Sequence, residues 1–259
     1  MEDLLILFIS FLVIMGVINV YKSKTSKVKY VKSTLYEDDT SEYLVRHNEG
    51  TLPQDRENNC DAGANAICFM RANLMKLVEQ VKHDRCPNEK CNVTPAKKEK
   101  DEKEALRDIK PEEIEMLINR FNPDNISEST PDNKYTSYSV NKGEKVVFCI
   151  REKNGPRKNK IINANTLMFV AIHELAHIMT KSIGHGDDFW NNMRYLLSVA
   201  IVTPAKQKYR NNTCAKKIKN QMGSSNHNIY NYENYSEKSS AYCGTNITTT
   251  PCNDDKCKT

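Results

Sequence analysis

Half of the six histidines in this 259-residue chain lie between residues 173 and 185. His173-Glu174-Leu175-Ala176-His177 forms an H-E-x-x-H motif, and His185 follows eight residues after its second histidine. Side chains four residues apart on a helix lie one above the other, about 5–6 Å apart at Cβ, so His173 and His177 can bind one metal ion together. The motif therefore predicts a helix, followed by a bend that brings His185 back to the same ion.

These residue types predict a catalytic site with one Zn²⁺ ion. A catalytic zinc ion has three protein ligands and an open fourth position, whereas structural sites usually have four ligands and are rich in cysteine. No cysteine lies between Cys149 and Cys214, so the local sequence supplies three ligands: His173, His177 and His185. Zinc acidifies a bound water molecule, and Glu174 is placed to take its proton as the general base. The alternatives are two surface histidines that meet by accident and a purely structural site.

Several other residues are weaker candidates for supporting roles in catalysis. Tyr195 and Tyr242 are candidate donors to a tetrahedral oxyanion, although the chain has twelve tyrosines. Asp188 is a candidate for orienting a ligand histidine, while Asp187 is better placed to cap a helix. Residues 145–151 form the clearest strand, and an exposed strand edge beside a zinc site can bind an extended peptide. The sequence does not decide whether this strand lies at the edge.

An apolar run from Leu4 to Val20 is interrupted only by Ser10, Gly16 and Asn19. As a helix it would reach about 25 Å, close to the length that crosses a bilayer. Residues 1–21 are therefore predicted to be a single transmembrane anchor, and residues 22–27 a basic tether. Because the lysines follow the run, the N-terminus is expected outside and the body on the cytosolic or virion-interior side.

The chain contains nine cysteines, an odd number. A cytosolic body favours free thiols. The C-x4-C pairs, Cys86 with Cys91 and Cys252 with Cys257, leave open a second metal site or disulfide bonds. A lumenal body would instead favour disulfides and glycans.

The remaining pattern predicts a mixed α and β chain with polar inserts. Only 39% of the residues are apolar, and the net charge of +5 is spread over segments in which Lys alternates with Glu and Asp, so no specific nucleic-acid partner is predicted. Residues 29–36 and 42–46 predict a β-hairpin. A helix is expected from Asp61 to about Val81, with an apolar stripe at Ile67, Met70, Leu74, Leu77, Val78 and Val81. Another helix begins at Pro111, with an apolar stripe at Ile114, Leu117, Ile118 and Phe121.

The H-E-x-x-H helix is expected to be buried. Asn165 or Thr166 would cap it, and residues 167–172 are apolar on every side, which is typical of a helix that runs through the core. Gly184 and Gly186 end the helix and allow the turn. A further helix follows from about Asp187, with Phe189, Met193, Leu196, Leu197 and Ala200 on one face.

The motif and the residues that follow it resemble the WLM metallopeptidase domain, a relative of the SprT and Spartan zincins. The resemblance rests on His173–His177 followed by Gly184-His185-Gly186 and Phe189-Trp190. Residues 136–143, 165–168 and 242–248 are similar to the WLM-like proteins of large eukaryotic DNA viruses. The resemblance covers most of residues 28–251.

The resemblance implies an α+β, zincin-like fold, with a small mixed sheet against the active-site helix and the transmembrane helix before it. It also implies the zinc ligands His173, His177 and His185, with Glu174 catalytic. Residues 28–251 would form the WLM-like domain, with inserts near 83–104 and 203–228 and a polar tail at 252–259.

The expected function is that of a membrane-anchored zinc peptidase, with a protein or peptide substrate. The alternatives are a catalytically silent, zinc-stabilised membrane scaffold that binds peptides or partner proteins, and hydrolysis of another amide or ester. The sequence does not indicate the oligomeric state.

Overall fold

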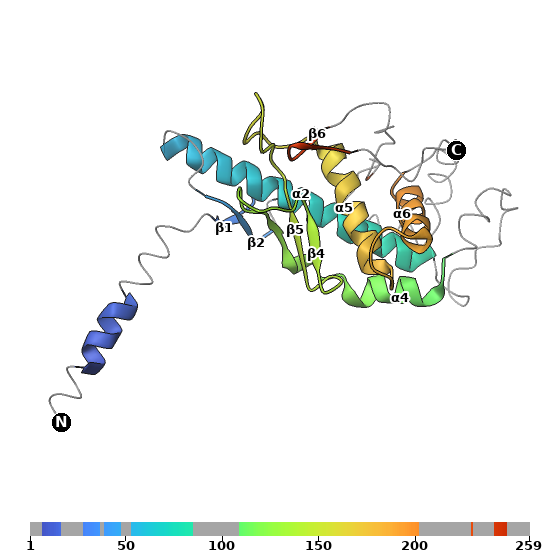
Figure 1. Ribbon diagram of the computed structural model, residues 1–259, viewed down its shortest axis with the longest axis horizontal. Helices are drawn as coiled ribbons and strands as arrows, with labels where there is room; N and C mark the ends of the chain where they lie inside the picture. The colour runs from blue at the N-terminus through green and yellow to red at the C-terminus, as the bar shows by residue number, and fades with distance from the viewer. Residues whose placement is uncertain are drawn as a thin grey trace, which may run out of the picture.

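The structure is a computed structural model of an α+β domain, in which helices pack against a small mixed sheet (Figure 1). The described residues are 7–16, 28–36, 39–47, 53–84, 109–201, 229 and 241–247, and the side chains of 53–59, 83–84 and 241 are not described. The predicted α+β class with a small mixed sheet is confirmed. The zincin-like assignment stays a prediction.

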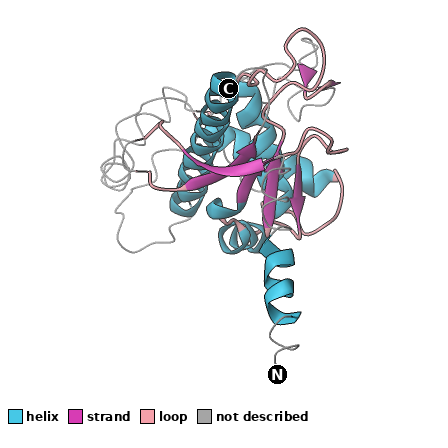
Figure 2. Ribbon diagram, turned by 90° about the vertical axis from the view of Figure 1, so that its left-hand side faces the viewer, coloured by secondary structure: helices cyan, strands magenta, loops and turns pink. Residues whose placement is uncertain are grey.

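The main sheet has five strands in the order β1-β2-β3-β5-β4 (Figure 2). β1 (Val28–Lys32) and β2 (Glu42–Arg46) form the predicted antiparallel hairpin. β3 (Ile126–Glu128) pairs in parallel with β2 and with β5 (Lys145–Phe148), and β4 (Tyr138–Val140) pairs antiparallel with β5. β5 is therefore an inner strand, and β4 and β1 form the two edges of this sheet.

Three long helices and a shorter one form the core with the sheet. α2 (Pro53–Asp84) contacts β1, β2 and β3, and it also crosses α5 (Ala164–Met179) and α6 (Asp187–Ala200) (Figure 1). α4 (Pro111–Arg120) packs against α5, and a short 3-10 helix, η1 (Pro123–Asn125), leads from it into β3. A second, two-stranded sheet consists of β6 (Ala241–Tyr242) and β7 (Thr245–Asn246).

The predicted apolar stripes are the core. In α2 the stripe residues are all buried: Ile67, Met70, Leu74, Leu77, Val78 and Val81. The predicted face of α6 is buried along its whole length, from Phe189 to Ala200. α5 buries twelve residues on all of its sides, because its first half carries no polar face. These predictions are confirmed.

Helix boundaries differ from the prediction. α2 begins at Pro53 and not at Asp61, since proline lacks the N–H that the first helical turn leaves unpaired. α5 is capped by Asn163, whose side chain accepts a hydrogen bond from the Asn165 backbone N–H. The helix ends at Met179, before the two glycines. Gly184 has φ +89° within the following turn, and Gly186 caps α6.

The prediction of a single-pass membrane protein is wrong for the described residues. Residues 7–16 form a helix that at about 1.5 Å per residue covers only about half of a bilayer's hydrocarbon core. No helix within the described ranges is both long and apolar enough to cross a membrane. The predicted topology, with the N-terminus outside and the body on the cytosolic or virion-interior side, depended on this membrane span and is therefore wrong as well.

Other predictions fall outside the described residues. The basic tether, the insert at 203–228, the tail at 252–259 and both C-x4-C pairs have no described residue, and of the insert at 83–104 only the end of α2 is described. The domain boundaries therefore stay predictions. The expectation of free thiols is wrong for two cysteines, because Cys149 and Cys243 form a disulfide bond.

Candidate metal centre

The structure brings the three predicted histidine ligands together. His173 and His177 lie on the same side of α5, and the turn at residues 180–186 returns His185 to them. The three Nε2 atoms are 3.1–3.2 Å apart in every pair. In a tetrahedral site with Zn–N bonds of about 2.0–2.1 Å, the ligand nitrogens lie about 3.3–3.4 Å apart. The donor set therefore fits one zinc ion with a shift of a few tenths of an ångström.

Burial prepares the three imidazoles for metal binding. It lowers the pKa of His173 to about 3, with a further contribution from the two neighbouring imidazoles. It lowers the pKa of His177 to about 4, assisted by His185 and Lys142, and it lowers the pKa of His185 as well. All three rings are therefore neutral near pH 7, and their nitrogens can bind a metal ion without first losing a proton.

Glu174 lies next to these ligands on α5 and is only 5% exposed. Burial raises its pKa to about 8, because a carboxylate loses its hydration there. A buried carboxyl group whose pKa lies near neutral pH suits a general acid and base. A cation bound by the three histidines would favour the ionised form of Glu174, which is the form that accepts a proton.

Phe189 packs against all three imidazoles. Its ring centroid lies 4.9 Å from that of His173, 4.4 Å from that of His177 and 4.6 Å from that of His185. Trp190 flanks the outermost of these rings, with a centroid distance of 5.6 Å to His185. The sequence placed Phe189 on the buried face of α6, and the Phe-Trp pair entered the family resemblance. Neither observation predicts that Phe189 contacts the three histidine ligands.

Lys142 holds the turn that carries His185. Its Nζ donates to the backbone oxygens of Thr180 at 2.9 Å and Ser182 at 2.6 Å. Lys142 follows the edge strand β4 in a turn where Asn141, Lys142 and Gly143 all have positive φ. The Asn-Lys-Gly sequence is a turn signal, but it gave no indication of this partner.

A second set of hydrogen bonds, made by Thr180 and Asn192, also holds this turn. The Thr180 hydroxyl donates to the Ala176 carbonyl at 2.7 Å and accepts from Asn192 Nδ2 at 2.9 Å. Asn192 is fully buried on α6. The turn is therefore attached to β4, α5 and α6 before any ion binds.

The weaker candidates lie in different places. The Tyr242 hydroxyl contacts Ser137 Oγ at 2.5 Å, and its pKa is raised mainly by burial and also by the charge of Glu174. Tyr195 is buried in the core on α6. Asp188 is exposed and lies 3.5 Å from Lys110 Nζ, and Asp187 is the first residue of α6. Of these, Tyr242 is the one that the electrostatics connect with Glu174.

Relatives of this chain occur in large DNA viruses. It is 33% identical over 88 residues to the uncharacterized protein R325 of Acanthamoeba polyphaga mimivirus, a match that covers 34% of this chain and 43% of that protein. It is 42% identical over 66 residues to the uncharacterized protein 042R of Invertebrate iridescent virus 3, covering 25% and 38% of the two chains. The matches thus span less than half of either viral relative. No solved structure matches the chain.

The family profile of the WLM domain matches residues 87–253, which is more than half of the 259 residues. This range includes α5, the turn after it and α6, and therefore all of the histidine ligands and Glu174. The chain belongs to the WLM domain family.

Proposed function

We propose that this chain is a zinc-dependent peptidase. The observation that carries the proposal is the convergence of three neutral imidazole nitrogens within 3.1–3.2 Å of one another, beside a buried carboxyl group on the same helix. The family association points in the same direction, since WLM domains are associated with zinc metallopeptidases.

The residues divide the chemistry between them. A zinc ion held by His173, His177 and His185 would polarise a peptide carbonyl and acidify a water molecule. Glu174 would take the proton from that water and deliver it to the leaving amine. Phe189 fills the space behind the imidazoles and excludes water from that side.

The position of β4 supports a peptide substrate. β4 is an edge strand of the sheet, so one side of its backbone is not paired with another of the described strands. Lys142 lies two residues after β4 and binds the turn that carries His185. An extended peptide added along β4 would thus run past the metal centre, held by main-chain hydrogen bonds. The candidate edge for a peptide is therefore β4 and not residues 145–151, because β5 lies inside the sheet.

The rival function is a zinc-stabilised scaffold that binds peptides without cutting them. Both functions use the same ligands and the same edge strand. They differ only in Glu174, because a scaffold has no use for a buried carboxyl group that must lose its hydration on folding.

The substitution Glu174→Gln separates the two functions. Wild-type and variant proteins, each loaded with zinc, are incubated with a proteome-derived peptide library, and new N-termini are identified by mass spectrometry. The peptidase predicts new termini with the wild type alone, while both proteins retain equal zinc. Glu115→Gln, at an exposed position on α4, is the matched control and should cut as the wild type does. Identical peptide profiles for wild type and Glu174→Gln would leave the scaffold as the explanation.

A further inference from the structure

The β6–β7 hairpin is too small to be stable by itself. Its two strands pair only Ala241 with Asn246 and Tyr242 with Thr245. The turn between them places Cys243 at φ +54° and Gly244 at φ +81°. An isolated two-stranded hairpin is marginal in water even when it is longer. Contacts with the main domain must therefore hold this hairpin in place.

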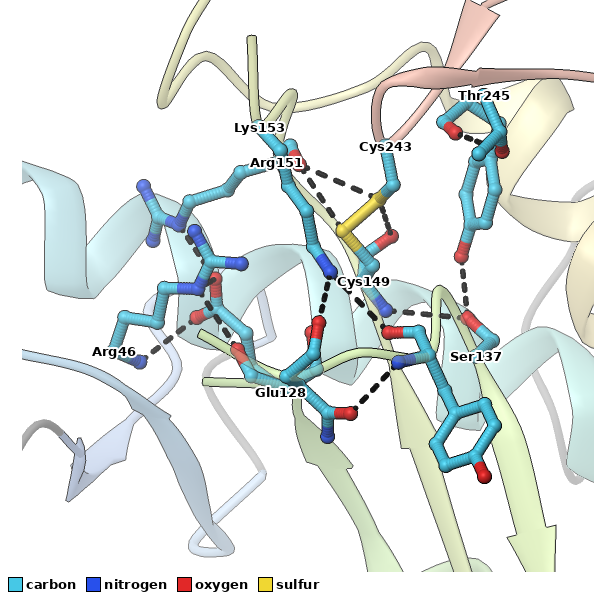
Figure 3. The surroundings of a disulfide bond; sticks show 12 residues. Arg46, Glu128, Ser137, Cys149, Arg151, Lys153, Cys243 and Thr245 are labelled. Atoms are coloured by element: carbon cyan, nitrogen blue, oxygen red, sulfur yellow. Dashed lines mark hydrogen bonds and ion pairs between the residues drawn. A yellow bond between two sulfur atoms is a disulfide. The ribbon is translucent and has the colours of Figure 1, made fainter. Parts of the chain in front are cut away.

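A disulfide bond between Cys243 and Cys149 joins the hairpin to the main domain (Figure 3). Cys149 is the residue that directly follows β5. The bond joins residues 94 positions apart, and both cysteines are buried. Glycine at position 244 allows a close approach, because a Cβ there would lie 2.7 Å from Asn154 Nδ2. The turn of the hairpin is thus seated on the chain segment that follows β5.

The same contact fixes Tyr242. Its hydroxyl lies 2.5 Å from Ser137 Oγ, and that oxygen accepts a hydrogen bond from the Cys149 backbone N–H at 3.2 Å. Cys149 therefore holds the hairpin through its sulfur and supports the Tyr242 contact through its amide. Figure 3 shows the disulfide and Ser137 on either side of the Cys149 backbone.

The hairpin contacts the segment that leads into the proposed peptide-binding strand. Ser137 directly precedes β4, the strand proposed to bind the peptide. Tyr242 is 4% exposed, and its hydroxyl contacts Ser137 at the start of this strand. Displacement of the hairpin would remove this buried contact and would loosen the segment that leads into β4.

We propose that the Cys149–Cys243 disulfide positions the β6–β7 hairpin for catalysis, so that reduction of this bond reversibly lowers peptidase activity. The proposal rests on the proposed function. When a phosphine reduces this disulfide, it attacks one sulfur and the S–S bond breaks. Water supplies the oxygen of the phosphine oxide and the two protons of the thiols, so the phosphine is oxidised and the two cysteines are reduced.

The experiment compares kcat and KM of the zinc-loaded protein before and after treatment with tris(2-carboxyethyl)phosphine. Mass spectrometry after thiol labelling verifies the state of Cys149 and Cys243, and zinc content is measured in the same samples. We expect kcat/KM to fall about tenfold or more, as for other misplaced active-site groups, with the loss in kcat and with zinc retained. Oxidised glutathione should then restore the rate, which distinguishes repositioning from unfolding.

Two double variants complete the test. Cys149→Ser/Cys243→Ser should be slow and unaffected by the phosphine. Cys60→Ser/Cys68→Ser is the matched control, because these two buried cysteines on α2 carry free thiols, and it should respond as the wild type does. Tyr242→Phe, which keeps the disulfide and removes the hydroxyl contact with Ser137, should also lower kcat.

Full reduction of Cys149 and Cys243 with an unchanged kcat/KM would overturn the proposal, as would loss of zinc in parallel with activity. Failure of the proposed function has a different signature. In that case the oxidised wild type hydrolyses peptides no faster than Glu174→Gln.

Discussion

The ring of Phe189 lies with its centroid 4.4 Å from the imidazole of His177, at an interplanar angle of 34°. This contact connects α6 with the H-E-x-x-H helix and, through the neighbouring rings, with all three ligands. A metal site depends on such supporting contacts, because they fix the orientation of each ligand before the ion binds.

Phe189→Ala should weaken zinc binding by about 10–100-fold, since the three imidazoles lose their common packing surface. The dissociation constant can be measured by competition with a chelating indicator. Phe148→Ala is the matched control, because Phe148 is equally buried but lies in β5. It should cost similar stability, about 3–5 kcal/mol, and leave zinc affinity unchanged in the folded protein. Equal zinc affinity in both variants would contradict the role of Phe189.

Lys142→Met should loosen the turn that carries His185. The change removes two hydrogen bonds to backbone oxygens of that turn, and each contributes about 0.5–1.5 kcal/mol net. We expect zinc to dissociate several-fold faster, which stopped-flow chelation measures. Lys181→Met, at an exposed position in the same turn, should leave the rate as in the wild type.

The pH dependence of stability should identify Glu174 in the metal-free chain. Its pKa is about 8 in the folded chain against an ordinary value of 4.5, so the folded state binds this proton more tightly than the unfolded state. The resulting stabilisation is present below about pH 4.5 and is lost as the pH rises towards 8. The lowered pKa values of the three histidines act in the opposite direction below about pH 6.5 and are shared by wild type and Glu174→Gln. The component from Glu174 is therefore measured as the difference between the two proteins in urea unfolding with a chelator, at several values between pH 5 and 8.

Glu174→Gln cannot lose that proton and should lack this component of the slope. The two proteins should therefore differ by a few kcal/mol more at pH 8 than at pH 5, with the variant the more stable at pH 8. Parallel curves for both proteins would show that Glu174 is not buried as the structure has it.

The buried group around Glu128 should be essential for folding. Its Oε1 lies 2.7 Å from Arg151 Nε and 3.3 Å from Arg46 Nε, and all three side chains are at most 1% exposed. Glu128→Ala would leave two guanidinium groups without this carboxylate, which costs about 3–5 kcal/mol for a buried pair. Chemical denaturation measures the loss, and Glu115→Ala, at the surface of α4, should change stability by less than about 0.5 kcal/mol.

The sequence predicted the parts of the site that depend on local spacing. The interval between His173 and His177 places both on one side of a helix, and the apolar residues 167–172 predict that the helix is buried. The glycines around His185 indicated a bend, though the helix ends at Met179, earlier than they suggest. These features depend on residues close together in the chain, where periodicity is informative.

The sequence does not predict the contacts between segments that lie far apart in the chain. The Cys149–Cys243 bond joins two of nine cysteines, and nothing in their spacing selects this pair. The hydrogen bonds of Lys142 depend on the packing of β4 beside α5, which the sequence does not specify. The apolar run at Leu4–Val20 predicts a membrane span from its hydropathy, but no helix among the described residues is long and apolar enough to cross a membrane.

The most direct test is the rate of peptide hydrolysis by wild type and Glu174→Gln at equal, measured zinc content. The account predicts that Glu174→Gln binds one zinc ion per chain and loses at least about 100-fold in kcat, the usual contribution of a positioned general base. It also predicts that removal of zinc with a chelator abolishes the wild-type rate and that added zinc restores it. A wild-type rate that equals the variant's, or one that survives complete removal of the metal, would contradict the account.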